Sequence, residues 1–338
     1  MRFKLSLVTA FAVVLATSSC ITTYYTDVQV LEPAEIAVPQ NIAELMLLNR
    51  NIYLPADTLE ENSAASEQEK MLELLNIAST ESIFSLADIL NETPRFEFID
   101  TTKILETFYT DSLQEPDPLN PGFIYQLVDS LEADALISLE YISFNDSTRT
   151  ISRGGRYEVT LYQMMEVLWR IYDGYNAEII DEHRFVDTLR WGSNSANLGR
   201  ARNAIPSREE AWMESAYFAS LKYGRRIAPH WVIDERMFYS SQFIPRLRSG
   251  AGMIDRHRWE DAAEMLIPLT DHWYKPLAAA ASFNMAFISE MRGSYSLAID
   301  WLRKALELRD SRGMRMYLEI LEERESKKER IDRQIPVQ

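Results

Sequence analysis

The sequence of 338 residues holds few side chains whose types and spacing could perform chemistry. Histidine is the most versatile acid–base group and metal ligand near neutral pH, and the four histidines are His183, His230, His257 and His272. None lies in the HExxH pattern of a zinc protease, and no serine lies in the Gly-x-Ser-x-Gly pattern of a hydrolase. We therefore expect structural histidines, no metal site, no cofactor and no enzymatic activity.

Two other local patterns have structural explanations. The pair Gly154-Gly155 is flanked by arginines, but a phosphate-binding loop needs more glycines and a following helix, whereas a β-rich run begins at Tyr157. We expect a hairpin turn there. Ser207 and Glu210 have the spacing of a capping box, so the acidic pair at 209–210 marks the start of a helix.

Cys20 is the only cysteine, and it ends a segment with the composition of an export signal. Arg2 and Lys4 precede an apolar stretch over residues 5–16, and three small residues precede the cysteine. This arrangement resembles the signal of bacterial lipoproteins, which implies removal of residues 1–19 and a lipid on Cys20. The alternatives are a cleaved soluble protein and an uncleaved anchor helix, although a membrane span needs roughly 20 apolar residues.

The residues around Cys20 also bear on location. The leucine usually found three residues before the cysteine is missing, which resembles lipoproteins of the Bacteroidota, and residues 21–26 carry no charge. In that group an acidic run after the cysteine accompanies export to the surface, and elsewhere an Asp beside it accompanies retention in the inner membrane. We therefore expect an outer-membrane lipoprotein of the cell envelope, with the periplasmic face favoured over the surface.

The charge balance limits the partners. Without residues 1–19 the chain contains 33 Lys and Arg against 51 Asp and Glu, a formal charge of −18. Such a chain repels phosphate backbones and anionic lipid headgroups, so we expect no nucleic acid partner and membrane contact only through the N-terminal lipid. Hydrophobic residues make up 46% of the sequence, which is ample for a packed core.

The mature length suggests two domains. We expect a lipidated tether over residues 20–40, an α/β domain over 41–245, a helical domain over 246–330 and a flexible tail over 331–338. In the α/β domain, apolar spacing and turn residues predict the order strand, helix, strand, helix, strand, strand, strand, helix. The expected ranges are 42–54, 67–93, 95–100, 123–131, 135–144, 157–172, 178–191 and 207–228. The predicted fold class is α+β, an N-terminal α/β sandwich with a mixed sheet and a long β-hairpin, followed by an all-α region.

Two motifs of the α/β domain carry a resemblance. They are Glu132-Ala133-Asp134-Ala135-Leu136-Ile137, which enters a strand, and Leu168-Trp169-Arg170-Ile171-Tyr172-Asp173 leading into Glu178-Ile179-Ile180. They resemble the domain shared by curli-assembly lipoproteins and the N-terminal part of the Tol-system β-propeller protein, over about residues 41–232. The resemblance implies an architecture only, because Asp134 and Asp173 are expected to hold turns. The chain departs from it at residues 175–177, where the family often has Thr-Gly.

Residues 277–308 contain a pattern close to that of tetratricopeptide repeats, which are helix pairs packed through small and large residues. Its positions are Ala281, Asn284, Ala286, Phe287, Gly293, Tyr295, Ala298, Ile299, Ala305 and Leu306. A weaker copy stands 36 residues upstream, with Trp259 in place of Tyr295 and His257 in place of the glycine. The resemblance implies an all-α tetratricopeptide-like region of about two repeats, closed by a last helix over 311–328.

Repeats of this kind bind peptides in their groove, so the resemblance implies partner-binding residues. These are Trp259, Asn284, Phe287, Tyr295 and Trp301. The alternative is that the helices only brace the α/β domain. Several tryptophans could instead stack on sugars, but most fall at positions expected in the core of the repeats or in the hairpin.

Short Asp-Ser/Thr-apolar sequences recur and resemble the acceptor of O-glycosylation in the Bacteroidota. The expected acceptors are Thr58, Thr101, Ser112, Ser147 and Thr188, of which Thr58 and Ser147 are expected in loops. Ordinary cap and turn chemistry also explains such sequences.

The whole chain resembles a family of Bacteroidota lipoproteins with a C-terminal tetratricopeptide-like region, a family without an assigned activity. We expect a non-enzymatic envelope lipoprotein that acts as a docking or assembly scaffold for other envelope proteins. The alternative is a glycan- or peptide-binding envelope receptor.

Overall fold

The computed structural model describes residues 21–53, 63–97, 99–100, 104–109 and 116–335. They form two compact units, which we call the α/β unit (residues 33–230 and 333–335) and the helical unit (residues 21–32 and 231–332). The α+β fold class is confirmed, with sheets followed by an all-helical region. Cys20 and the predicted acceptors Thr58, Thr101 and Ser112 lie outside the described residues.

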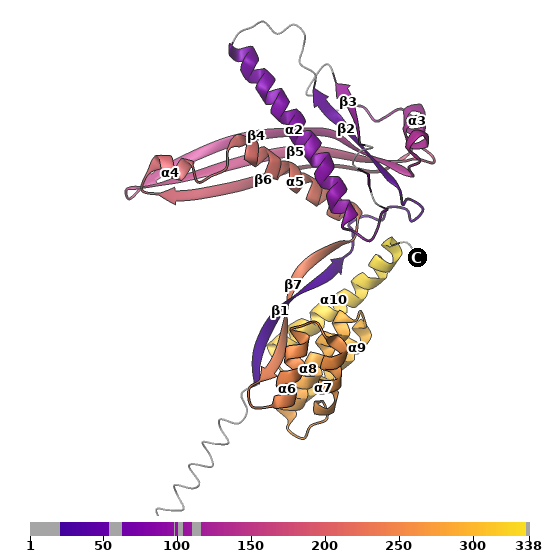
Figure 1. The fold of residues 1–338 in the computed structure, drawn as a ribbon, viewed down its shortest axis with the longest axis vertical. Helices are drawn as coiled ribbons and strands as arrows, with labels where there is room; N and C mark the ends of the chain where they lie inside the picture. Colours follow the sequence, from indigo (N-terminus) through magenta and orange to yellow (C-terminus); the bar gives the residue numbers. More distant parts are fainter. Residues whose placement is uncertain (1–20, 54–62, 98, 101–103, 110–115, 336–338) are drawn as a thin grey trace, which may run out of the picture. The chain divides into compact units, whose positions relative to one another are not determined.

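The α/β unit is built on a five-stranded sheet in the order β3-β2-β4-β5-β6 (Figure 1). Its strands are β2 (Leu45–Tyr53), β3 (Leu105–Tyr109), β4 (Ala135–Arg153), β5 (Arg156–Asp173) and β6 (Ile179–Ser195). Strand β2 runs parallel to β3 and β4, whereas β5 runs antiparallel to both of its neighbours, β4 and β6. The sheet is therefore mixed, as predicted. We call the last three strands, which are 17 to 19 residues long, the long ribbon.

Helices cover the two faces of this sheet unequally. The helices of the unit are α2 (Ser63–Asn91), α3 (Pro121–Leu131), α4 (Leu198–Arg202) and α5 (Arg208–Ile227). Because side chains alternate along a strand, Met165, Val167 and Trp169 of β5 all point to the core beneath α2 and α5. The ring of Trp169 stacks on Tyr223 of α5 with centroids 5.1 Å apart. On the other face α3 covers only a small cluster around Tyr172.

The predicted turns of the unit are confirmed. Gly154 and Gly155 join β4 to β5 with φ values of 59° and 75°, a region that favours glycine. In the next hairpin the Asp173 carboxylate accepts the N–H of Tyr175 at 2.7 Å. A Cβ atom on Gly174 would lie 2.5 Å from the carbonyl oxygen of Asp134, so this position requires glycine.

One predicted strand is wrong. The described residues of 95–100 form no strand. The buried Arg95 guanidinium donates to the carbonyls of Ile42, Val38 and Pro39 and holds the chain in a bend there. The strand of this part of the chain is β3, which pairs with β2 instead. With that change the order of strands and helices agrees with the prediction, apart from the short α4.

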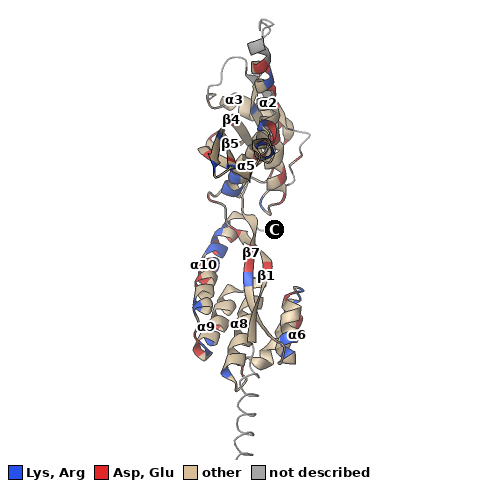
Figure 2. Ribbon diagram, turned by 90° about the vertical axis from the view of Figure 1, so that its left-hand side faces the viewer, with Lys and Arg blue, Asp and Glu red and all other residues tan. Residues whose placement is uncertain are grey.

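The helical unit combines a two-stranded sheet with five α-helices. Its elements are β1 (Ile21–Glu32), β7 (His230–Ser241), α6 (Pro245–Ile254), α7 (Trp259–Leu266), a 3-10 turn (Ile267–Leu269), α8 (Lys275–Met291), α9 (Tyr295–Leu308) and α10 (Arg312–Gln334). Figure 2 shows the β1–β7 pair against α8, between α6 and α10.

The helices pair as the repeat pattern predicts, α6 with α7 and α8 with α9. Gly293 makes the tight turn of the second pair with φ 70°. His257 stands at the equivalent turn of the first pair and adopts φ 56°, the same left-handed conformation. A residue with a Cβ atom is strained there, so this turn costs the protein about 1 kcal/mol.

The two units divide the chain differently from the predicted domains. Residues 21–32, expected within a tether over 20–40, form β1, because Val28 and Val30 belong to the core of the helical unit. Residues from 231 onward also belong to that unit, whereas the predicted boundary lay between 245 and 246. Residues 331–338 were expected to be a flexible tail, but α10 continues to Gln334, whose amide bonds both backbone groups of Ala34 at 2.9 and 3.1 Å.

Candidate functional site

The helical unit uses Asn284 to hold a strand of its own chain. The side-chain oxygen of Asn284 accepts the N–H of Tyr239 at 2.8 Å, and its nitrogen donates to the carbonyl of the same residue at 2.8 Å. Asn284 lies on α8, is fully buried, and has both polar ends of its carboxamide bonded to β7. It is therefore not accessible to a partner, in contrast to the prediction.

The β1–β7 pair fills the surface beside Asn284. Val28, Val30 and Phe238 of the two strands are buried in one cluster with α8 and its neighbours. The ring of Tyr239 packs edge-on against Phe283 of α8, with centroids 5.0 Å apart. A partner peptide therefore has no room where the repeat pattern predicts one, because β7 already lies there.

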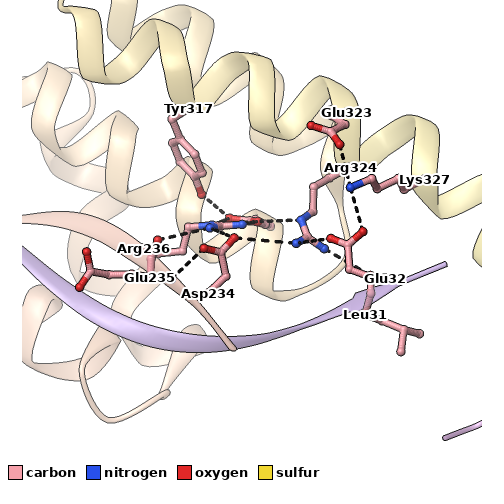
Figure 3. Close-up of polar contacts among 10 residues, drawn as sticks. Leu31, Glu32, Asp234, Glu235, Arg236, Tyr317, Glu323, Arg324 and Lys327 are labelled. Carbon is pink, nitrogen blue, oxygen red and sulfur yellow. Dashed lines mark hydrogen bonds and ion pairs between the residues drawn. The ribbon is translucent and has the colours of Figure 1, made fainter. Parts of the chain in front are cut away.

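A buried charge cluster fastens the same strands to α8 and α10 (Figure 3). Glu290 accepts hydrogen bonds from the Arg236 guanidinium at 3.0 Å and from the Tyr317 hydroxyl at 2.5 Å. Arg324 of α10 pairs with Glu32 of β1 at 3.0 Å, and Lys327 pairs with the same carboxylate at 2.8 Å. Because each of these charges has a partner, we assign the cluster to stability rather than to catalysis.

The protonation states within this cluster follow from burial and charge. Burial raises the pKa of Tyr317 well above its ordinary value, and the neighbouring Glu290 raises it further. Burial alone would lower the pKa of Arg236, but the hydrogen bonds and charge of Glu290 outweigh it and raise that pKa. Both shifts favour a protonated Tyr317, which donates to Glu290, and a charged Arg236.

An open hollow lies at another edge of the helical unit. It has a volume of about 550 Å³ and is lined by Asp27, Val28, Gln29, Ile233, His257, Trp259 and Met291. The ring of His257 stacks on Trp259 with centroids 5.2 Å apart, and Trp259 meets the buried Phe287 edge-on at 5.8 Å. Ile233 is 73% exposed, so a large apolar side chain faces solvent at the rim. We call this feature the Trp259 hollow.

Of the five predicted partner-binding residues, only Trp259 lines the hollow. Phe287 supports it from the core. Tyr295 and Trp301 of α9 are partly buried against the same core, and Lys304 lies over the Trp301 ring at 5.1 Å. Sequence reasoning missed Asp27, Gln29 and Ile233, which the pairing of β1 with β7 brings to this edge.

The α/β unit has its own buried carboxylate, which also has a structural role. Glu140 pairs with Arg50 and, at 3.6 Å, with Arg170, and it accepts the Tyr172 hydroxyl at 2.7 Å. Burial raises the pKa of Glu140, although Arg50, Tyr172 and Arg170 act in the opposite direction. The two arginines also donate to the carbonyls of Asp117 and Pro116, so the cluster fixes the chain that enters α3.

The described residues offer neither a metal-binding cluster nor a membrane-spanning helix. They contain no group of three or more His, Cys, Asp or Glu side chains that could hold a metal ion. No helix in the described part of the chain is long and apolar enough to cross a membrane.

The two predicted acceptor residues that the structure describes lie on strands. Ser147 is on β4 and Thr188 is on β6, so the prediction of a loop around Ser147 is wrong. Ser147 lies opposite Tyr162, and Thr188 lies opposite Met164, two neighbouring positions on the same face of β5. Both side chains are exposed on the face of the long ribbon that points away from α2 and α5.

Comparison with solved structures gives distant likenesses. A Helicobacter pylori protein described as a neuraminyllactose-binding hemagglutinin homolog is 10% identical, with 58% of this chain and 87% of that chain covered and a TM-score of 0.26. A Caulobacter crescentus protein described as a lipoprotein is 17% identical, with 31% and 78% covered and a TM-score of 0.14. A hypothetical protein from Chlamydia trachomatis is 8% identical, with 54% and 96% covered and a TM-score of 0.20.

Family models match both parts of the chain, whereas no curated protein matches it. The model described as Domain of unknown function (DUF6340) matches residues 248–329. The model described as Domain of unknown function (DUF8603) matches residues 42–239, more than half of the chain. Neither description names tetratricopeptide repeats, so that resemblance stays a prediction. The chain belongs to the family described as Domain of unknown function (DUF8603).

Proposed function

We propose that the chain is a non-enzymatic lipoprotein of the cell envelope that docks another envelope protein at the Trp259 hollow. Cys20 carries the lipid in this proposal, which places the chain at the outer membrane with the periplasmic face favoured. The partner contributes an extended segment with a large apolar side chain next to a basic one. Residues on β1, β7 and α7–α8 receive it.

The observation that carries the proposal is the composition of the hollow. Its walls include Ile233, Trp259 and Met291, and a hollow of about 550 Å³ accommodates a large side chain. Exposed apolar side chains around a concavity are typical of protein-binding sites. Asp27 is exposed and adds a carboxylate at the same place, which favours a basic neighbour in the bound segment.

A glycan receptor is the alternative, and the hollow supports it less. Sugar recognition by stacking calls for flat aromatic faces open to solvent. Trp259 is the only tryptophan of the hollow, and one of its neighbours is the stacked ring of His257. The most exposed tryptophan, Trp273 at 86%, is not part of the hollow. It lies just before the start of α8, whereas Met291 of the hollow is the last residue of that helix.

The test is photo-crosslinking in intact cells of the producing bacterium. A photoreactive amino acid replaces Ile233 at the hollow. A matched variant carries it in place of Trp273, which belongs to the same unit but lies at the end of α8 opposite Met291, a helix about 25 Å long. We expect one envelope protein to be captured from position 233 and not from 273. Its capture falls severalfold when Trp259→Ala or Asp27→Lys is added, and it is lost in the Cys20→Ala form.

Either of two results contradicts the proposal. Equal capture from positions 233 and 273 means that the hollow has no special role. Absence of a captured protein, while the lipidated chain is abundant, favours the receptor instead. In that case added oligosaccharides should quench the fluorescence of the purified chain, and Trp259→Ala should remove the effect.

A further inference from the structure

The long ribbon has one face without a covering layer. Side chains of β5 alternate, so Met165 and Val167 point to α2 and α5, whereas Met164 and Tyr162 point away from them. Met164 is 43% exposed, and Val186 on β6 is 56% exposed. Beyond the small cluster under α3, no described helix covers this side, which we call the open face.

The far end of the open face is basic, in a chain that is otherwise strongly acidic. At the far end of the ribbon, the strand positions on this side hold four arginines, Arg149, Arg153, Arg156 and Arg190, against one acid, Glu158. Arg149 on β4 and Arg190 on β6 are both exposed, and neither forms an ion pair with any described residue. The guanidinium of Arg190 lies over the Tyr162 ring at 5.9 Å.

The same unit carries a surface of the opposite charge. Residues 33–140 contain 21 Asp and Glu against four Lys and Arg. Along α2, positions that recur at helical spacing form one exposed stripe, and its members include Glu73, Ile77, Glu81, Phe84 and Asp88. Ile77 and Phe84 in this stripe are 49% and 39% exposed. An acidic stripe with apolar side chains is the complement of a basic face with apolar side chains.

The spacing of the charges agrees on the two surfaces. Glu73 and Glu81 are eight residues apart on a helix, which corresponds to about 12 Å. Arg149 and Arg190 lie two strands and one side-chain repeat apart, which also corresponds to about 12 Å. Ile77 stands between the two acids, and Tyr162 stands beside Arg190 between the two arginines.

We propose that the open face binds the α2 stripe of a second copy of this chain. Within one copy the two surfaces lie on opposite sides of the sheet, since α2 covers the other face, so they cannot meet each other. Each copy therefore offers one surface of each kind. Such a head-to-tail contact continues from copy to copy and yields a ring or a filament rather than a closed two-fold dimer.

The test is sedimentation velocity on the chain from residue 20 onward, with Cys20→Ser so that no lipid is attached. We expect species larger than a monomer that increase with protein concentration and decrease with salt. Arg149→Glu with Arg190→Glu, and separately Glu73→Arg with Glu81→Arg, should each weaken association at least about tenfold. Mixing the two variants should restore association. The acidic open face of the first variant then meets the basic α2 stripe of the second, and the two native surfaces also have opposite charges.

Controls separate the proposal from general charge effects and from misfolding. Arg256→Glu with Arg312→Glu changes the charge by the same amount at exposed positions of the helical unit and should leave association unchanged. Ile77→Cys with Tyr162→Cys should give disulfide-linked multimers on oxidation, whereas Ile77→Cys with Trp273→Cys should not. A monomer at all concentrations, or association that neither variant weakens, overturns the proposal. Binding of the monomer to phosphatidylglycerol vesicles, lost in Arg149→Glu with Arg190→Glu, would assign the face to lipid headgroups and also overturns it.

Discussion

The carboxamide of Asn284 accepts a hydrogen bond from the N–H of Tyr239 and donates one to its carbonyl, each at 2.8 Å. Asn284 thus binds the backbone of strand β7 through both polar groups of its side chain. A side-chain amide suits this task because it offers one acceptor and one donor side by side. The residue type that the repeat pattern assigns to partner recognition therefore fixes the chain's own strand. The partner binding that we propose therefore uses another part of the helical unit.

Replacing Asn284 should destabilise the helical unit. In Asn284→Ala the two backbone groups of Tyr239 lose their partners inside the protein, and we expect the free energy of unfolding to fall by about 2 kcal/mol. Urea denaturation followed by circular dichroism measures it. Asn145→Ala, at an exposed position of β4, is the control and should change stability by less than about 0.5 kcal/mol. Similar losses in both variants would remove the special role of Asn284.

Neutralising Glu290 should cost more. Its side chain is 1% exposed and pairs with Arg236 at 3.0 Å. In Glu290→Gln the buried Arg236 charge keeps only the half-exposed Asp234 as a counter-charge. Breaking a buried pair costs about 3–5 kcal/mol, and we expect a loss near the lower end of that range. The same denaturation experiment measures it. Glu260→Gln removes a carboxylate that is 72% exposed and pairs with Arg292 at 3.6 Å, so its effect should stay below about 1 kcal/mol.

Local signals in the sequence predicted most of the fold. The turn at Gly154-Gly155 and the capping box of Ser207 depend on residues close together in the sequence, and both are present. The pairing of β1 with β7 was missed because it joins segments 218 residues apart, as in the contact of Thr22 with Ser240. No local pattern determines which distant strand an apolar segment will pair with.

The same reason explains what was missed at the candidate site. Trp259 was found because it occupies a repeat position, but Asp27 and Ile233 come from the two strands whose pairing was not predicted. The role of Asn284 was missed for the same cause. Its residue type was informative, whereas its partner, Tyr239, is 45 residues away in the sequence.

Gly293 and Gly252 allow a matched pair of substitutions by alanine. An added Cβ atom meets no atom within 4 Å at either position, so only the backbone decides the result. Gly293 has φ 70°, and alanine there should lower stability by about 1–2 kcal/mol. Gly252 lies within α6, where alanine should raise stability by about 0.5–1 kcal/mol. Shifts of the same sign in thermal unfolding would contradict the left-handed turn at Gly293.

The stability of the α/β unit should depend on the ionisation of Asp134. Its carboxylate accepts the N–H groups of Ala43 and Glu44 at 2.8 and 2.9 Å and the hydroxyl of Tyr175. Burial alone would raise the pKa of Asp134, but these hydrogen bonds outweigh it and hold the pKa below its ordinary value. The folded state therefore binds the Asp134 proton less tightly than the unfolded chain.

The sign of the pH effect follows from that difference. The stabilisation by Asp134 is fully present above its unfolded pKa, about 3.9, and is lost as the pH falls through the lower folded value. Asp134→Asn should lower the free energy of unfolding by about 1–2 kcal/mol near neutral pH, and this deficit should shrink below about pH 4. Urea denaturation of both proteins between pH 3 and 7 measures it, with the exposed Asp129→Asn as the control. A deficit that stays constant or grows toward acidic pH would show that Asp134 acts through its shape and not through its charge.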